Sequence, residues 1–272
     1  MKILKKTLFY FVFSAILFLF MFPFILVLMS SFKSNIDIIN APLALPKEFD
    51  FTNYINAFVG MNYFRSISNS LYITITSIVF TLVTSSMAAH LFVRKRWAIN
   101  KFIFFAMVAS MIIPFQTIMI PLIKTFGTLG LMNNRNTLLF YYAAANTPLA
   151  VFMYHGFIKG IPFELEEAAQ IDGCTPFGVF FKVVLPLLKP ISLTLFILNA
   201  LWVWNDFLFP YIVLKGKDNA TLPLSTFRFV ESYFTDYSLT TSGMILTILP
   251  IIIVYLFMQK HIVEGVVQGA IK

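Results

Sequence analysis

The sequence is poor in charge, has a single cysteine and has no motif for nucleotide hydrolysis. Only 12% of its 272 residues are charged and 59% are apolar, whereas a soluble domain carries about 25% charged residues. So few charges cannot cover the surface of a soluble protein. The lone Cys174 excludes an intrachain disulfide. The phosphate-cradling loop G-x-x-x-x-G-K-[ST] is absent, because the one Gly-Lys pair, Gly216-Lys217, is followed by Asp218.

Long apolar runs fill the chain instead. A helix needs about 20 apolar residues to cross a bilayer, and six runs approach or exceed that length: 8–31, 71–93, 102–123, 137–158, 190–214 and 239–259. We therefore predict an all-α integral membrane protein with six transmembrane helices in a single domain, 1–272. The first run follows the basic start MKILKK, as in a signal peptide. It is longer than the roughly 7 to 15 residues of a signal-peptide core, so we expect a membrane anchor.

The distribution of Lys and Arg predicts the orientation, since these residues favour the cytoplasmic side. With the N-terminus inside, twelve of the twenty fall on the inner side and eight on the outer side. The densest cluster, VRKRWAINK at 93–101, lies in the short second loop. Both termini are therefore predicted to be cytoplasmic. Topology and attraction to anionic lipid headgroups account for the net charge of +8, and no aromatic-basic stripe supports a nucleic-acid partner.

The segment 160–189, between the fourth and fifth runs, is unusually acidic. Four of the twelve acidic residues lie within nine positions: Glu164, Glu166, Glu167 and Asp172. Pro162 suits a first helical turn, and acidic residues after it complement the positive helix N-terminus. Gly173 is typical of the residue that ends a helix. We predict a short acidic helix that stops at an Asp-Gly corner.

A second short helix is expected directly after that corner. Thr175 followed by Pro176 is typical of an N-cap and a first helical residue. Phe177, Phe180, Phe181 and Val184 are spaced to form one apolar face. Pro186 and Pro190 then bend the chain back toward the membrane. The two helices together are predicted to present a surface to a partner on the cytoplasmic side.

The same segment carries a spaced motif. Glu167-Ala168-Ala169 is followed, after three intervening residues, by Gly173 and then by VVLP at Val183–Pro186. This resembles the EAA signature of permease subunits in binding-protein-dependent ABC importers, without insertion. One departure is Val183, where that family often has Ile.

Other stretches resemble the oligosaccharide-type branch of these permeases, similar to the inner partner permease of the maltose importer. These stretches are NYINAF (53–58), SNSLYIT (68–74), MIIPFQTIMIPL (111–122), LWVWNDFLFP (201–210) and EGVVQGAIK (264–272). The resemblance depends on the order and spacing of the stretches, and it covers nearly the whole chain.

The resemblance implies a type I ABC importer permease fold and a role as a transport subunit rather than an enzyme. It implies a second permease, an ATPase dimer that uses ATP and Mg, an extracytoplasmic solute-binding protein and an oligosaccharide substrate. No cofactor, metal or catalytic residue is expected in this chain, and its place would be the bacterial cell membrane. The residues expected to couple it to the ATPase are Glu166, Glu167, Ala168, Ala169, Asp172, Gly173 and Pro186, with a C-terminal contact from Glu264, Gly265 and Gly269.

A polar cluster in the fifth run is the candidate for the gate or substrate path. Asp206 lies about 22 Å along that run at 1.5 Å per residue, where an acidic residue usually faces a cavity or a partner. Trp202, Trp204 and Asn205 precede it. Interfacial anchoring by Trp and helix association through Asn and Asp are the alternatives.

Two further features have less specific interpretations. The outer loop 215–237 is expected to contact the binding protein by resemblance, although a solvated connector has the same composition. His90 is more typical of a packed or interfacial histidine than of a proton relay.

Two other classes of protein remain as alternatives. An ion-driven secondary transporter needs ionisable residues near the bilayer midplane, and Asp206 alone is available. A membrane-bound enzyme lacks a convergent catalytic set. Within the importer interpretation, a monosaccharide derivative or glycerol phosphate is an alternative to an oligosaccharide.

Overall fold

The computed structural model describes the backbone of residues 2–230 and 235–270, and the side chains of 5–230 and 235–259. Within these ranges every regular element is helical, which confirms the predicted fold class. The residues group into two compact units. Unit 1 comprises Met1–Ser66 and Leu222–Pro250, and unit 2 comprises Ile67–Thr221 and Ile251–Lys272. The single permease domain stays a prediction.

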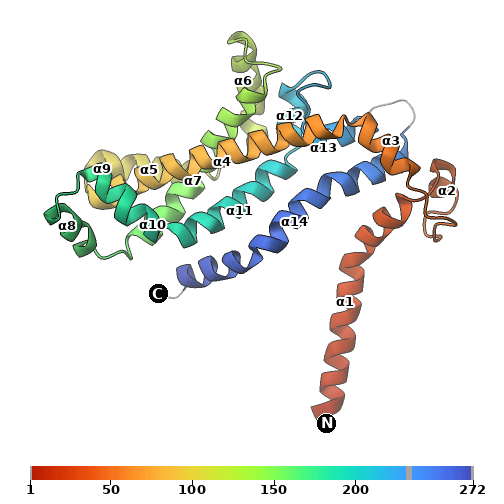
Figure 1. Cartoon of the computed structure of the whole chain (residues 1–272), viewed down its shortest axis with the longest axis horizontal. Helices are drawn as coiled ribbons and strands as arrows, with labels where there is room; N and C mark the ends of the chain where they lie inside the picture. Colours follow the sequence, from red (N-terminus) through yellow and green to blue (C-terminus); the bar gives the residue numbers. More distant parts are fainter. Residues whose placement is uncertain (1, 231–234, 271–272) are drawn as a thin grey trace. The chain divides into compact units, whose positions relative to one another are not determined.

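Figure 1 labels the α-helices along the chain, and a short π-helical turn between α9 and α10 completes the described helical elements. They are α1 (Lys2–Ser30), α2 (Asn35–Asn40), α3 (Thr52–Gly60), α4 (Tyr63–Arg94), α5 (Ala98–Ser110), α6 (Phe115–Thr128), α7 (Arg135–Ile158), α8 (Glu164–Ile171), α9 (Pro176–Val179), the π-helical turn η1 (Phe180–Val184), α10 (Leu185–Leu187), α11 (Lys189–Asn205), α12 (Leu208–Val213), α13 (Leu222–Phe227) and α14 (Tyr237–Ala270).

Four of the six predicted runs lie in continuous helices. The runs 8–31, 71–93, 137–158 and 239–259 correspond to α1, α4, α7 and α14. The helices extend past the runs because apolarity marks only the part suited to the bilayer core, whereas helical hydrogen bonding continues into polar residues such as those at the start of α4.

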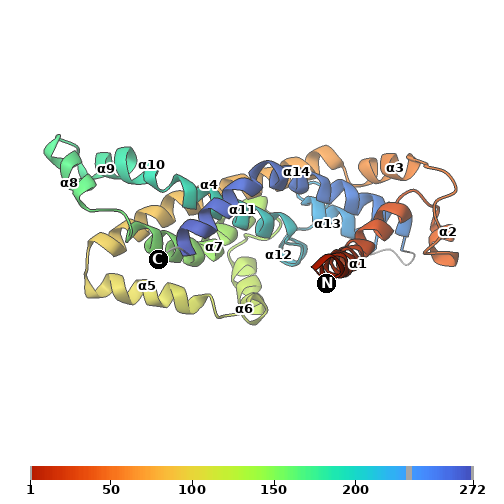
Figure 2. The same cartoon turned by 90° about the horizontal axis from the view of Figure 1, so that it is seen from below.

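The predicted helix 102–123 is wrong as a single element. The chain forms α5 and then α6, bent by 104° at the break after Ser110. Pro114 precedes α6 with φ −63° and ψ 140°, and a proline disfavours the helical conformation of the residue before it. Figure 2 shows the steep turn from α5 into α6.

The predicted helix 190–214 is also interrupted. It ends at Asn205, Asp206 adopts φ −68° and ψ 125°, and α12 begins at Leu208. The Asp206 carboxylate accepts a hydrogen bond from the Leu208 backbone N–H at 3.0 Å. Asp206 therefore lies at a helix break rather than inside a helix, because its side chain competes for local backbone groups.

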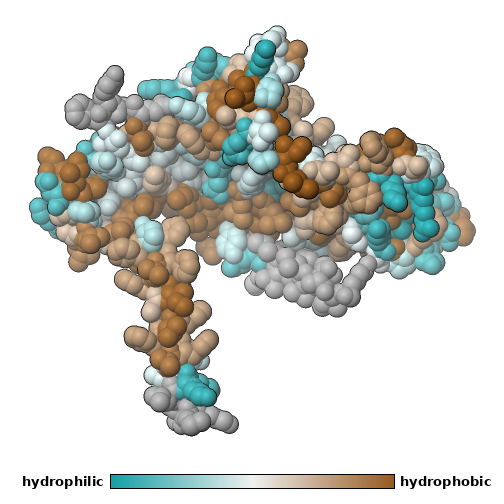
Figure 3. Space-filling model, turned by 180° about the vertical axis from the view of Figure 1, so that it is seen from behind, coloured by the Kyte–Doolittle hydropathy of each residue, from teal (hydrophilic) through white to brown (hydrophobic). Residues whose placement is uncertain are grey.

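By length and composition, three of the described helices are suited to cross a membrane, or up to five if each bent pair is one span. The three are residues Lys5–Ser30, Tyr63–Arg94 and Tyr237–Gln259, and α7 is not among them. The count of six spans therefore stays a prediction. No residue in the most apolar window of α1 is buried, and Figure 3 shows this helix as hydrophobic along most of its length. Such a surface is suited to lipid or to another subunit.

The core of unit 2 joins α4, α7, η1 and α11. Fully buried residues at its centre include Ala89, Ala150, Tyr154, Val184 and Leu195. The small Ala89 and Ala150 allow close approach of helices, as is typical of helix packing in membranes. The Tyr154 hydroxyl and Ser192 Oγ, 2.7 Å apart, share a hydrogen bond between α7 and α11.

Unit 1 is held together by polar contacts to the end of α1. Asn53 donates from Nδ2 to the backbone oxygens of Ser31, at 3.1 Å, and Lys33, at 2.9 Å. Ser242 Oγ donates to the Ser31 oxygen at 3.1 Å. These bonds satisfy carbonyl groups that the end of a helix leaves free, so they fix the chain where it leaves α1.

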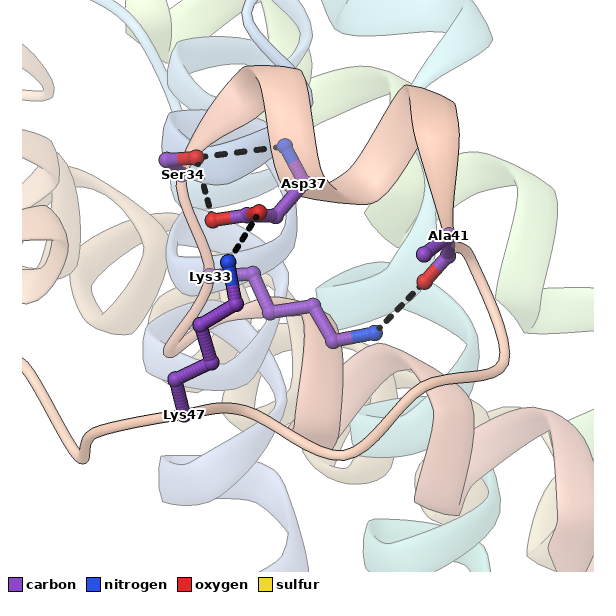
Figure 4. A network of polar contacts seen from close by, with 5 residues as sticks. All are labelled: Lys33, Ser34, Asp37, Ala41 and Lys47. Carbon is purple, nitrogen blue, oxygen red and sulfur yellow. Dashed lines mark hydrogen bonds and ion pairs between the residues drawn. The ribbon is translucent and has the colours of Figure 1, made fainter.

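A small polar network orders the segment after α1, as Figure 4 shows. Ser34 caps α2 by accepting from the Asp37 backbone N–H at 3.1 Å, and Lys47 pairs with Asp37 at 3.3 Å. Hydrogen bonds from Ser34 and Lys47 lower the pKa of the Asp37 carboxyl. The buried Lys33 donates from Nζ to the oxygens of Ala41, at 3.2 Å, and Pro42, at 3.0 Å. The conformation of the segment 33–47 is therefore stabilised by contacts within the segment itself.

Candidate functional site

The acidic helix α8 ends as the sequence predicts. Gly173 follows it with φ +85°, a conformation that glycine adopts without a steric penalty. The Gly173 N–H donates to the Gln170 oxygen at 3.0 Å, and the Cys174 N–H donates to the Ala169 oxygen at 3.0 Å. This pair of bonds is the Schellman motif that terminates helices. The predicted corner between two short helices is confirmed.

The second short helix also begins as predicted. Thr175 Oγ1 accepts from the Gly178 N–H at 3.2 Å, and Pro176 is the first residue of α9. Figures 1 and 2 both show α8 and α9 at the end of unit 2 where α4 terminates. The chain then bends by 72° between Leu187 and Lys189, next to the predicted Pro186 and Pro190.

The predicted apolar face of that second helix is wrong in part. Phe180 and Val184 are buried in the core of unit 2, whereas Phe177 and Phe181 are exposed. Phe177 lies in the first turn of α9, before the π turn η1, in which the Leu185 N–H bonds to the Phe180 oxygen five residues back. Pro186 lacks an N–H and its ring crowds the carbonyl four residues before it, which favours a wider turn. The wider turn changes the register of the face.

Glu166 is the most buried side chain of α8. Its carboxylate accepts a hydrogen bond from Arg94 Nε at 2.7 Å and lies 2.8 Å from His90 Nε2. Arg94 also donates from Nη2 to the Ile161 oxygen at 3.0 Å, and its guanidinium lies 5.4 Å from the Phe163 ring centroid. The helix is therefore tied to the end of α4 by a charged pair that is largely shielded from water.

This arrangement changes what Glu166 can do. It was expected to face the ATPase, but its carboxylate is directed at Arg94 and His90 of its own chain. The sequence offered no signal for the pair, since 72 residues separate Arg94 from Glu166. His90 contacts the same Glu166 carboxylate, in line with its interpretation as a packed or interfacial histidine.

The other predicted coupling residues divide between the core and the surface. Glu167, Ala168, Asp172, Gly173 and Pro186 are exposed, and Ala169 is half-buried against the core of unit 2. Ile171 is 86% exposed and lies on the same small surface. We call Glu167, Ala168, Ile171 and Asp172 the outward face of α8. This face combines an exposed apolar side chain with a small residue and two acidic residues.

The gate candidates do not form one cluster. The Tyr142 hydroxyl donates to the Asp206 carboxylate at 2.8 Å, joining α7 to the break after α11. Trp202 is half-exposed and lies edge-on to Tyr142, whereas Trp204 is buried. Asn205 donates from Nδ2 to the Leu201 oxygen of its own helix at 2.8 Å. The Asp206 carboxylate is thus held by a tyrosine, and Trp202 and Asn205 are the exposed side chains of the set.

An aromatic cluster that the sequence did not reveal surrounds this site. The rings of Tyr141 and Phe209 lie 3.8 Å apart, and Phe115 lies 5.6 Å from Tyr141 and 5.7 Å from Phe209. These residues come from α6, α7 and α12, so no spacing along the chain predicts their contact. The cluster fixes the two breaks in the predicted spans.

Two predicted contact regions are described only in part. The loop 215–237 lacks a described structure at 231–234, and near its start the Lys215 N–H donates to Asn133 Oδ1 at 2.9 Å. Glu264, Gly265 and Gly269 lie on the backbone of α14, but their side chains lie outside the described residues. Among the described residues, no group of three or more His, Cys, Asp or Glu residues is arranged to hold a metal ion.

Comparison with known proteins identifies the family. Residues 81–268 match the binding-protein-dependent transport system inner membrane component. The chain belongs to this family. The permease is 38% identical over 250 residues to the probable starch degradation products transport system permease protein AmyC of Thermoanaerobacterium thermosulfurigenes, covering 92% of this chain and 91% of AmyC. It is 34% identical over 258 residues to the arabinooligosaccharides transport system permease protein AraQ of Bacillus subtilis (strain 168), covering 93% and 91%.

A solved structure confirms the fold of the permease. A chain of a bacterial ABC transporter involved in the import of the acidic polysaccharide alginate superposes with a TM-score of 0.79 at 22% identity, covering 94% of this chain and 96% of that chain. The permease therefore has the predicted type I ABC importer fold. It is a multi-pass membrane transport subunit and not an enzyme.

Proposed function

We propose that the permease forms half of the translocation pathway of an importer that moves an oligosaccharide into the cell with energy from ATP. Family membership supports the transport role. The names of the relatives AmyC and AraQ, which refer to starch degradation products and arabinooligosaccharides, support an oligosaccharide over a monosaccharide derivative or glycerol phosphate. An ion-driven mechanism has no support from the family.

The observation that carries the proposal is the way α8 is held. Its inner side is fixed by Glu166 to Arg94 and His90, and Ala169 packs against the core of unit 2. A helix that is fixed to its own chain on one side and exposed on the other can transmit the movement of a bound partner to the helices that hold it. The outward face of α8 is therefore proposed to dock on a separate ATPase subunit, whose closure moves α7 and α11 together with α4.

A separate ATPase is required because the whole sequence lacks a phosphate-cradling loop. ATP and Mg are proposed to bind only to that subunit. Gly173 allows the sharp turn that keeps the outward face clear of α9, and Glu167 is free to pair with a basic residue of the ATPase. The C-terminal Glu264, Gly265 and Gly269 are proposed to reach the same partner.

The remaining assembly is part of the same proposal, and membership of a binding-protein-dependent transport family supports it. A second permease supplies the other half of the pathway, and an extracytoplasmic binding protein delivers the sugar. The excess of Lys and Arg on one side of the predicted spans supports cytoplasmic termini in a bacterial cell membrane. Trp202 and Asp206 are proposed to lie near the external gate, where an aromatic ring and a carboxylate are suited to a sugar.

The test uses the complete assembly, with its ATPase and binding protein, in proteoliposomes. Maltotriose, raffinose, arabinotriose and glycerol phosphate serve as labelled probes. We expect uptake of at least one oligosaccharide that requires ATP and survives an ionophore that removes ion gradients. Uptake driven by an ion gradient without ATP, or uptake of glycerol phosphate alone, would contradict the proposal.

A further inference from the structure

A second site lies where α4 ends, and it takes no part in the proposed coupling surface. A pocket of about 530 Å³ opens between the end of α4, the turn before α5, and α7. Its lining contains five cationic residues and no acidic residue: Arg94, Lys95, Arg96, Lys101 and Lys159. Figure 3 shows hydrophilic side chains gathered toward this end of unit 2.

Four of these five cations have no counter-charge. Arg94 is paired with Glu166. Lys95, Arg96, Lys101 and Lys159 are exposed, and their side chains form no ion pair or hydrogen bond within the part of the chain that the structure describes. Like charges held around one pocket repel each other, so an anion that enters it is stabilised.

The start of α5 adds to this attraction. Ala98, its first residue, lines the pocket. Trp97 at the N-cap provides no side-chain hydrogen bond, and the first turn has no acidic residue. The Asn100 N–H already donates to the Trp97 oxygen at 3.1 Å, so the Ala98 and Ile99 N–H groups are the ones that an anion can use, and the helix dipole favours negative charge there.

The flanks of the pocket are apolar and open. Trp97, Ile99, Phe102 and Phe105 are all between 57% and 69% exposed. Trp is typical of the level of lipid headgroups, and α5 is half of a bent pair apolar enough to cross a membrane. A free phosphate would use only the cations, whereas a phospholipid would also cover these side chains with its acyl chains.

We propose that this pocket binds the phosphate headgroup of an anionic phospholipid. Lys95, Arg96, Lys101 and Lys159 surround the phosphate, and the exposed side chains of α5 lie along the acyl chains. Basic pockets between membrane helices are suited to such headgroups. Because Arg94 lines the pocket and also holds Glu166, the bound lipid would lie beside the pair that anchors α8.

The experiment uses the assembled transporter in nanodiscs that contain equal fractions of either phosphatidylglycerol or phosphatidylcholine with brominated acyl chains. Bromine quenches tryptophan over short distances. Subtraction of the signal of the Trp97→Phe variant isolates the contribution of Trp97, so the other tryptophans can remain. We expect stronger quenching of Trp97 by brominated phosphatidylglycerol than by brominated phosphatidylcholine.

The decisive variant replaces Lys95, Arg96 and Lys101 with Gln. Its preference for phosphatidylglycerol should fall about fivefold for each cation removed. The control replaces Lys124, Lys215 and Lys217, which are exposed cations elsewhere in unit 2, and should keep the preference. Equal quenching by both lipids, or an equal loss in the control, would overturn the proposal.

Inorganic phosphate separates the two sources of the anion. The preference for phosphatidylglycerol should persist when millimolar phosphate is added, because a free ion lacks acyl chains. If phosphate removes the preference, the pocket takes the free ion and the lipid assignment is wrong. Because the readout is binding, its result does not depend on whether the transporter moves a sugar.

Discussion

The Glu166 carboxylate of α8 lies 2.7 Å from Arg94 Nε at the end of α4, with His90 at 2.8 Å on its other oxygen. Glu166 is 2% exposed, whereas the residues of the outward face of the same helix are exposed. Two neighbouring glutamates therefore have different surroundings: Glu166 faces its own chain and Glu167 faces outward.

The first prediction compares these two glutamates. Glu166→Ala leaves the Arg94 charge without its partner in a largely buried position, which should cost about 3 kcal/mol of stability. Glu167→Ala removes an exposed side chain and should change stability by less than about 0.5 kcal/mol. Thermal unfolding of the purified full-length chain measures both. Equal midpoints for the two variants would show that the pair does not anchor α8.

The second prediction concerns the corner at Gly173. Gly173→Asp places a side chain at φ +85°, which should strain the backbone by about 1 kcal/mol, and adds a charge beside the outward face of α8. We expect uptake to be lost while the chain still inserts in the membrane. Gly156→Ala is the matched control, because its added carbon meets no atom within 4 Å, and it should keep uptake. Normal uptake by Gly173→Asp would remove the coupling role of this corner.

The third prediction tests the contact between α7 and the helix break. Tyr142→Phe removes the donor to Asp206, and a partly buried acceptor that loses its partner costs about 1 kcal/mol. The neighbouring Tyr141 packs on Phe209 through its ring, so Tyr141→Phe should have little effect. Uptake and thermal unfolding of both variants measure the difference. A larger loss in Tyr141→Phe than in Tyr142→Phe would show that ring packing and not the hydrogen bond fixes Asp206.

The fourth prediction concerns the packing of unit 1. A methyl group at Gly243 would lie 3.2 Å from Met61 Sδ and 3.2 Å from Thr226 Cγ2. Overpacking of this kind typically costs about 1–3 kcal/mol, so Gly243→Ala should unfold at a lower temperature. Gly127→Ala, whose added carbon meets nothing within 4 Å, is the control. An unchanged midpoint for Gly243→Ala would mean that Met61 moves aside without cost.

The sequence predicted well where local chemistry decides the structure. The end of α8 needs only Gly173, and the start of α9 needs only Thr175 and Pro176, so both could be located by their residue types. Prediction failed where distant residues decide. The pairing of Glu166 with Arg94 brings together residues 72 positions apart in the chain, and no pattern within either segment indicates it.

The broken helices show a second limit of prediction from the sequence. Composition predicted continuous spans at 102–123 and 190–214, because a hydropathy window averages over proline and aspartate. In the structure, regular helix stops between Ser110 and Phe115, where Pro114 precedes α6, and again at Asp206. Phe115, Tyr141 and Phe209 then pack together beside these breaks. The partners of these rings come from three helices, so only the fold reveals them.

Cross-linking through a single cysteine tests the central claim most directly. Cys174→Ser removes the one native cysteine, and Ala168→Cys then places a thiol on the outward face of α8. In the assembled transporter, a short bifunctional reagent should link position 168 to the ATPase, with a yield that changes when ATP binds. Ile113→Cys, at an exposed position between α5 and α6, should not link. Absence of any product at position 168, or the same product from position 113, would contradict the account.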